Sequence, residues 1–101
     1  MDVPAITVAA ERLRDFRGRW HLPDTGSALC EVRRSTGDDT LDTLACEAIL
    51  QCVDENLMTI ARGRDRSLAR AERRAAVQQT RTVMRDCSTQ RLRELERHFD
   101  D

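Results

Sequence analysis

The sequence predicts a small all-α protein: a long antiparallel helical hairpin with a short N-terminal helix packed on it. The chain of 101 residues has only four glycines and two prolines, too few turn formers for a fold of many short strands. Apolar residues recur at three- and four-residue spacing over long stretches, as on one face of a helix. Four cysteines supply cross-links that a core with only three aromatic residues needs. We expect one domain over residues 1–101, with an N-terminal helix and connector in 1–37 and the hairpin in 38–99.

The N-terminal part is predicted to hold one helix and a connector. Pro4 suits the first turn of a helix, and the apolar pattern that follows predicts a helix over about 5–18. The stretch 21–27 is rich in turn formers and predicts a connector. Residues 28–34 leave two interpretations open. Apolar and polar residues alternate there as in a strand, but a lone strand has nothing to pair with, and a helical turn capped by Ser27 fits equally well.

The hairpin is predicted to consist of two helices. Asp38 is a good N-cap for a first helix over about 40–62, and acids in a first turn suit the helix dipole. Gly63 is the natural stop of this helix. A second helix, with no glycine or proline inside it, is expected over about 66–99.

Charge is unevenly distributed along a chain whose formal net charge is only −1. Six acids and no base lie between Asp38 and Glu55, whereas six arginines and two acids lie between Arg62 and Arg74. Adjacent segments of opposite sign are expected to attract one another. The alternative is that the basic end meets an anionic partner. The near-neutral total argues against a dedicated nucleic-acid-binding domain, which is usually strongly basic.

The cysteine spacing predicts disulfides rather than a metal site. No two cysteines have the close spacing of structural zinc ligands, and no Cys-x-x-Cys redox motif is present. Two disulfides would place the protein in an oxidising compartment: periplasmic or secreted, or the mitochondrial intermembrane space. Four free thiols in a cytoplasmic protein remain the alternative. Neither a signal-peptide pattern nor an apolar run long enough to span a membrane is found in the sequence.

Helix geometry predicts one pairing of the four cysteines. If the hairpin turns near Gly63, residues whose numbers sum to about 129 face each other, which brings Cys46 to within about 6 Å of Cys87 along the axis. Cys46 and Cys52 lie on one helix, farther apart than the roughly 7 Å that a disulfide allows between Cα atoms. We therefore expect Cys46–Cys87 and Cys30–Cys52.

The sequence contains no recognisable catalytic motif. His21 lies in a turn, and His98 lies near a helix C-terminus, where a histidine is comfortable at the surface. The acids near Asp38 lack calcium-loop spacing and are explained by helix capping. We expect no enzyme, no cofactor, no metal site and no small-molecule substrate.

Binding of another protein is the expectation that remains. Trp20 is a reasonable interface anchor, although it can also pack on the hairpin. Arginine suits phosphate and carboxylate groups alike, so the basic segment predicts either an acidic protein surface or, less favoured, a nucleic acid. The candidate partner-binding residues are Trp20, Arg62, Arg64, Arg66, Arg70, Arg73 and Arg74.

The second half also resembles a known family. The residues that carry the resemblance are Cys46, Leu50, Asp54, Leu57, Gln78, Arg85, Asp86 and Cys87. In this order they resemble the N-terminal domain of LprI-type lysozyme inhibitors, small exported bacterial helical proteins with disulfides. The resemblance covers about residues 30–87 and departs at Ala61 and Arg81, where the family has a tyrosine and a tryptophan. It implies a periplasmic or secreted inhibitor or interaction module without a cofactor.

Together these observations predict a non-catalytic helical protein-binding module, with an exported inhibitor of a hydrolase such as lysozyme as its specific form. Two alternatives stay open. One is a structural accessory subunit of a larger, for example mitochondrial, assembly. The other is an arginine-patch nucleic-acid binder.

Overall fold

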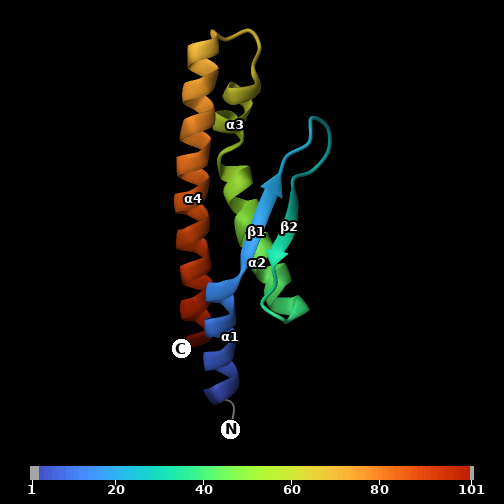
Figure 1. The fold of residues 1–101 in the computed structure, drawn as a ribbon, viewed down its shortest axis with the longest axis vertical. Helices are drawn as coiled ribbons and strands as arrows, with labels where there is room; N and C mark the ends of the chain where they lie inside the picture. The colour runs from blue at the N-terminus through green and yellow to red at the C-terminus, as the bar shows by residue number, and fades with distance from the viewer. Residues whose placement is uncertain (1–2, 101) are drawn as a thin grey trace.

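The molecule is a rod of 59 × 22 × 18 Å, with one long helix running along it (Figure 1). A computed structural model describes the backbone of residues 3–100 and the side chains of residues 8–99. The elements, in chain order, are α1 (Val3–Asp15), β1 (Arg17–His21), β2 (Leu29–Arg34), α2 (Asp39–Glu55), α3 (Leu57–Arg64) and α4 (Arg70–Asp100). Within the described part of the chain, no helix is both long and apolar enough to cross a membrane.

The structure is mostly helical but contains a two-stranded antiparallel sheet, so the all-α prediction is wrong in that respect. The predicted helix over 5–18 ends at Asp15, and the chain continues directly into β1. β1 is the partner that residues 28–34 lacked in the sequence interpretation, and Trp20 pairs with Cys30 in the register. Gly26, with φ of +99°, lies in the connector between the strands, in a conformation that favours glycine.

The first arm of the hairpin is two helices rather than one over 40–62. Asp38 caps α2 as predicted, because its carboxylate accepts hydrogen bonds from the N–H groups of Thr40 and Leu41 at 2.8 and 3.1 Å. The break between α2 and α3 falls at Asn56, which has a non-helical φ of −121°. Its side-chain amide donates to the carbonyl of Cys52 at 2.8 Å. The carbonyl oxygen of Cys52 is therefore still hydrogen-bonded at the point where the helix breaks.

The turn of the hairpin lies farther along the chain than Gly63. α3 continues to Arg64, a loop follows, and α4 begins at Arg70. Gly63 instead serves close packing, since a Cβ built on it would lie 2.9 Å from Cγ2 of Val77 on α4. Asp65 holds the loop by accepting hydrogen bonds from the N–H and hydroxyl of Ser67 at 2.9 and 2.6 Å.

The shift of the turn overturns the predicted disulfide pairing. The disulfides are Cys30–Cys46, which ties β2 to α2, and Cys52–Cys87, which ties α2 to α4, with Cα–Cα distances of 5.6 and 5.9 Å. The residue numbers of the second pair sum to 139 instead of 129, and the Gly63–Val77 contact has nearly the same sum. Because α3 and the loop displace the turn, Cys52 rather than Cys46 faces Cys87. All four cysteines are cross-linked, as expected, but to different partners.

The core consists of two clusters stacked along the rod. The first contains Leu13, Phe16, Leu41, Ala45 and Ile49, and the second contains Cys52, Val53, Ile60 and Met84. Trp20 packs against both clusters and so joins the sheet to the helices. Gly18 lets β1 approach α2, because a Cβ there would lie 2.9 Å from both Ile49 and Phe16.

Candidate partner-binding groove

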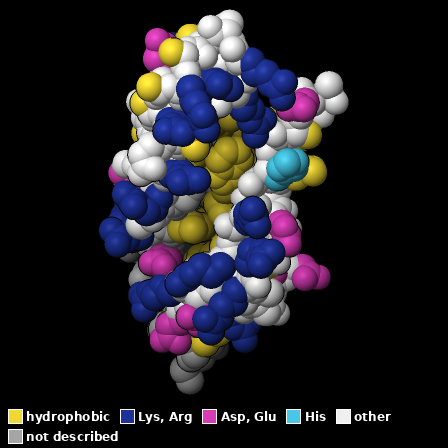
Figure 2. Space-filling model, turned by 45° about the horizontal axis from the view of Figure 1, so that its top comes forward, with side chains coloured by type: hydrophobic (Ala, Val, Ile, Leu, Met, Phe, Trp, Pro, Cys, Tyr) yellow, Lys and Arg dark blue, Asp and Glu magenta, His cyan; other side chains and the backbone are white. Residues whose placement is uncertain are grey.

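A groove of about 820 Å³ runs between α4 on one side and the end of α1 with β1 on the other. Figure 2 shows this hollow with apolar side chains, in yellow, at its bottom and arginine side chains, in dark blue, around it. Its apolar lining residues are Leu13, Phe16, Gly18, Trp20, Ile49, Met84 and Leu92. Most of these side chains belong to the core, so the bottom of the groove is the outer surface of packed, cross-linked structure.

The rim of the groove is strongly basic. It carries five arginines and one carboxylate, a formal charge of +4: Arg14, Arg17, Arg81, Arg85, Arg93 and Glu96. Glu96 lies 3.8 Å from Nε of Arg14 and so connects the two walls. Arg17 is held in place by its own backbone surroundings, since it donates to the carbonyls of Arg14 and Phe16 at 3.0 and 2.7 Å. The side chains of Arg81, Arg85 and Arg93 are exposed.

The periodicity of α4 explains why one helix supplies a whole wall. The rim and lining residues of α4 recur every three or four positions, which places them on one face of an α-helix. Between the arginines this face carries the small side chains of Ser88 and Thr89. These small residues leave space that larger side chains would fill.

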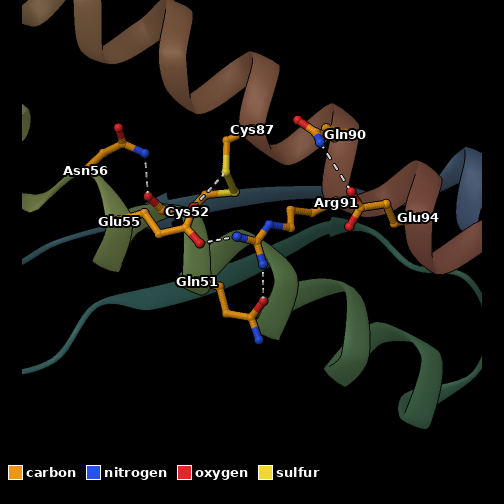
Figure 3. A network of polar contacts seen from close by, with 8 residues as sticks. All are labelled: Gln51, Cys52, Glu55, Asn56, Cys87, Gln90, Arg91 and Glu94. Atoms are coloured by element: carbon orange, nitrogen blue, oxygen red, sulfur yellow. Dashed lines mark hydrogen bonds and ion pairs between the residues drawn. A yellow bond between two sulfur atoms is a disulfide. The ribbon is translucent and has the colours of Figure 1, made fainter.

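The neighbouring face of α4 ties the long helix to α2 (Figure 3). Arg91 donates to the side-chain oxygen of Gln51 at 2.9 Å and forms an ion pair with Glu55. The Glu55 carboxylate also lies 3.7 Å from Sγ of Cys87, a contact without a hydrogen bond because a disulfide sulfur has no hydrogen to donate. Cys87 and Arg91 are on this second face, so cross-link and ion pair hold α4 in place while its other face stays open to the groove.

Trp20 packs on the helices, as one of its two sequence interpretations expects, and its role as an interface anchor stays a prediction. It packs against the two core clusters, and its half-buried side chain also lines the groove. It is the only tryptophan of the chain.

The arginines singled out in the sequence lie at the other end of the rod, around the α3–α4 turn. Arg64 donates to the carbonyl of Leu22 at 2.7 Å and so fastens the strand connector to α3. Arg62 lies 4.0 Å from Glu72. Arg66 is exposed in the loop. The three at the start of α4 line a second, smaller hollow: Arg70, Arg73 and Arg74.

Trp20 and these six arginines therefore do not form one site. The residue that lines both hollows is Arg81, which the sequence analysis did not single out. The spacing of Arg81, Arg85 and Arg93 predicts that they share one face of a helix, and this pattern could have indicated one wall of the groove. The other wall, from α1 and β1, could not be predicted because the sequence analysis did not predict the sheet. The ion pair formed by Glu55 of the acidic segment joins it to Arg91, which lies outside the basic segment.

Two carboxyl groups have a lowered pKa because of hydrogen bonds from nearby residues, Asp42 and Asp65. Burial alone would raise the pKa of Asp42, but hydrogen bonds from Ser35 and Thr36 outweigh it and hold the pKa of this carboxyl below 3.8. Hydrogen bonds from the Ser67 side chain and backbone lower the pKa of Asp65. Among the described residues, no group of three or more His, Cys, Asp or Glu side chains is arranged to hold a metal ion.

Comparisons of the chain with models of protein families, with curated proteins and with solved structures give no match. The interpretation of the groove therefore depends on its own geometry.

Proposed function

We propose that this protein is a non-catalytic binding module that holds an acidic, apolar segment of another protein in the groove between α4 and β1. The observation that carries the proposal is a hollow in which the half-buried side chains of Trp20 and Leu92 are bordered by five arginines. Apolar contact supplies affinity when it is removed from water. Guanidinium groups form paired hydrogen bonds with carboxylates, so the rim selects an acidic partner.

Several physical features favour such a partner. Tryptophan and arginine are the residue types that most often dominate binding energy at protein interfaces, and Trp20 lies among the rim arginines. The two disulfides and the buried core beneath the groove fix its shape before binding, which lowers the entropic cost of association. A single-stranded nucleic acid would need aromatic faces on which its bases stack. Of the two aromatic lining residues, Phe16 is only 2% exposed, so Trp20 alone could stack on a base. A single stacking residue disfavours a nucleic-acid partner.

The resemblance to LprI-type proteins supports an inhibitor as the specific form of this function. Most glycoside hydrolases act through a pair of carboxyl groups in a cleft. Exposed arginines on α4, such as Arg85 and Arg93, would attract such carboxylates and cover the entrance of the cleft. Export to an oxidising compartment, periplasmic or extracellular, accords with the two disulfides.

The fluorescence of Trp20, the single tryptophan, gives a direct test of groove occupancy. A short synthetic peptide of leucine and glutamate should shift the Trp20 emission in a saturable, salt-sensitive titration. A peptide of leucine and glutamine should bind much more weakly. The triple variant Arg81→Gln, Arg85→Gln, Arg93→Gln should lose binding by about tenfold or more, since each lost charge pair contributes to affinity.

A matched control removes three exposed arginines that do not line the groove: Arg34→Gln, Arg66→Gln and Arg97→Gln. It should bind the acidic peptide as the original protein does. Equal weakening in both triple variants would mean that only total charge matters, and the groove proposal would then be wrong.

Lysozyme activity on bacterial cell walls tests the inhibitor form separately. Inhibition by the oxidised protein that is lost in the groove variant supports it. Peptide binding without any inhibition would leave the binding module in place and exclude lysozyme as the target.

A further inference from the structure

The second hollow, at the α3–α4 turn, concentrates positive charge without the apolar floor of the groove. It has a volume of about 460 Å³, and its lining residues are Gly63, Arg70, Arg73, Arg74, Val77, Gln78 and Arg81. Four of these seven are arginines and none is acidic. The hollow therefore combines a high local positive charge with a dense set of N–H donors.

One of these donors lacks an acceptor. Nε of Arg73 is buried and has no hydrogen-bond partner, although Arg73 as a whole is half-buried. Buried charged N–H groups are nearly always hydrogen-bonded in folded proteins, and an exception often marks the place of an ion or water. The protein itself therefore supplies no acceptor to Nε of Arg73.

The neighbouring carboxylates are already engaged. Asp65 is close enough to Arg73 to feel its charge, but its oxygen accepts two hydrogen bonds from Ser67. Glu72 lies by Arg62 at 4.0 Å. Neither carboxylate lines the hollow.

The start of α4 adds to the field in the hollow. Arg70 is the first residue of a helix of 31 residues, and Ala69 before it has no side-chain acceptor to cap the first N–H groups. The N-terminal end of a helix carries partial positive charge and favours anions.

We infer that this hollow is a binding site for a tetrahedral oxyanion of the phosphate class, either free phosphate or the phosphate group of a small monoester. A dianion with four oxygens can accept from several guanidinium groups at once, whereas a single carboxylate has only two oxygens and one charge. The hollow shares Arg81 with the groove, but Arg70 and Arg74 line the hollow alone, so the site can be tested independently of the proposed groove function.

Calorimetric titration of the oxidised protein with inorganic phosphate, at constant ionic strength set by chloride, tests the inference. Saturable binding of one phosphate is expected. The double variant Arg70→Gln, Arg74→Gln changes two exposed side chains of the hollow and should bind phosphate about tenfold more weakly or worse. The matched control Arg34→Gln, Arg97→Gln, which loses the same charge elsewhere, should keep the affinity of the original protein.

Phenyl phosphate and a short single-stranded RNA are titrated in the same way as two further ligands. Tighter binding of phenyl phosphate than of inorganic phosphate assigns the site to a monoester, and the reverse order assigns it to the free anion. Tighter binding of the RNA than of both, lost in the same variant, would overturn the small-anion assignment in favour of a nucleic acid. No saturation at millimolar phosphate, or equal loss in the control variant, would overturn the site itself. The acidic peptide should still bind the Arg70 and Arg74 variant, so that failure here and failure of the groove proposal are told apart.

Discussion

Cys52 of α2 and Cys87 of α4 are joined with their Cα atoms 5.9 Å apart, and Met84, on the preceding turn of α4, belongs to the same core cluster as Cys52. Since Met84 also lines the groove, the cross-link lies directly beneath the candidate binding surface. The Cys52–Cys87 disulfide therefore supports both the floor of the groove and the stability of the fold.

Removal of this cross-link should cost more stability than removal of the other. The bonded cysteines are 35 residues apart in Cys52–Cys87 and 16 apart in Cys30–Cys46. Chain entropy then predicts losses of about 4 and about 3 kcal/mol for paired replacement by alanine. Urea unfolding of the two double variants measures this order. A larger loss of unfolding free energy from Cys30→Ala, Cys46→Ala would contradict this order. It would show that anchoring the sheet on α2 stabilises the protein more than closing the longer loop does.

The contact of Gly63 with Val77 predicts an overpacking effect. Gly63→Ala should destabilise the protein by about 1 kcal/mol, because the cost of the close contact exceeds the gain in helix propensity. Val77→Ala, at a side chain 39% exposed, should cost little alone and should relieve most of the loss when combined with Gly63→Ala. A double-mutant cycle from thermal unfolding measures the coupling. Strict additivity would mean that the two helices do not touch there as tightly as described.

Asp42 should make stability depend on pH in acid. Its pKa in the folded protein is lowered from its ordinary value, so its contribution to stability is fully present above that ordinary value and is lost as pH falls through the folded pKa. Asp42→Asn should destabilise the protein at neutral pH by about 1 kcal/mol and flatten the acid dependence below about pH 5. Chemical unfolding over this pH range compares it with Asp39→Asn, an exposed acid at the start of the same helix. An unchanged acid slope in Asp42→Asn would contradict the assignment.

The Arg91 network should matter less than the cross-link beside it. Arg91 and Glu55 are 32% and 51% exposed, and ion pairs in contact with water contribute little. Arg91→Met should therefore lower the free energy of unfolding by less than about 1 kcal/mol. Loss comparable to that of the Cys52 and Cys87 double variant would show that the ion pair, rather than the disulfide, holds α4 on α2.

Prediction from sequence succeeded where local interactions decide the structure and failed where distant residues do. The Asp38 cap and the long glycine-free α4 follow from neighbouring residues, and both are confirmed. The strand over Arg17–His21 exists because it pairs with Leu29–Arg34, a segment for which the sequence left both a strand and a helical turn open. The disulfide pairing depended on the position of the turn, which moved because α3 runs through Gly63.

The residues that line the groove together could not be predicted from the sequence for the same reason. Trp20 could be proposed as an anchor from its residue type alone. Its neighbours on the groove, Arg14 and Arg17 on one wall and Arg81 and Arg85 on the other, are far apart in sequence. They are brought together because α1 packs against α4 and β1 packs against α2.

Arg81 lines both hollows, so the two lie end to end along α4 from Arg70 to Glu96, a span of about 39 Å at 1.5 Å per residue. A partner that carries an acidic apolar segment and a phosphate group within that reach would engage both at once. The second contact would then form at a high effective concentration, and the combined avidity would exceed either affinity alone by orders of magnitude. Two weak sites on one rigid helix can in this way select a long partner over every shorter one.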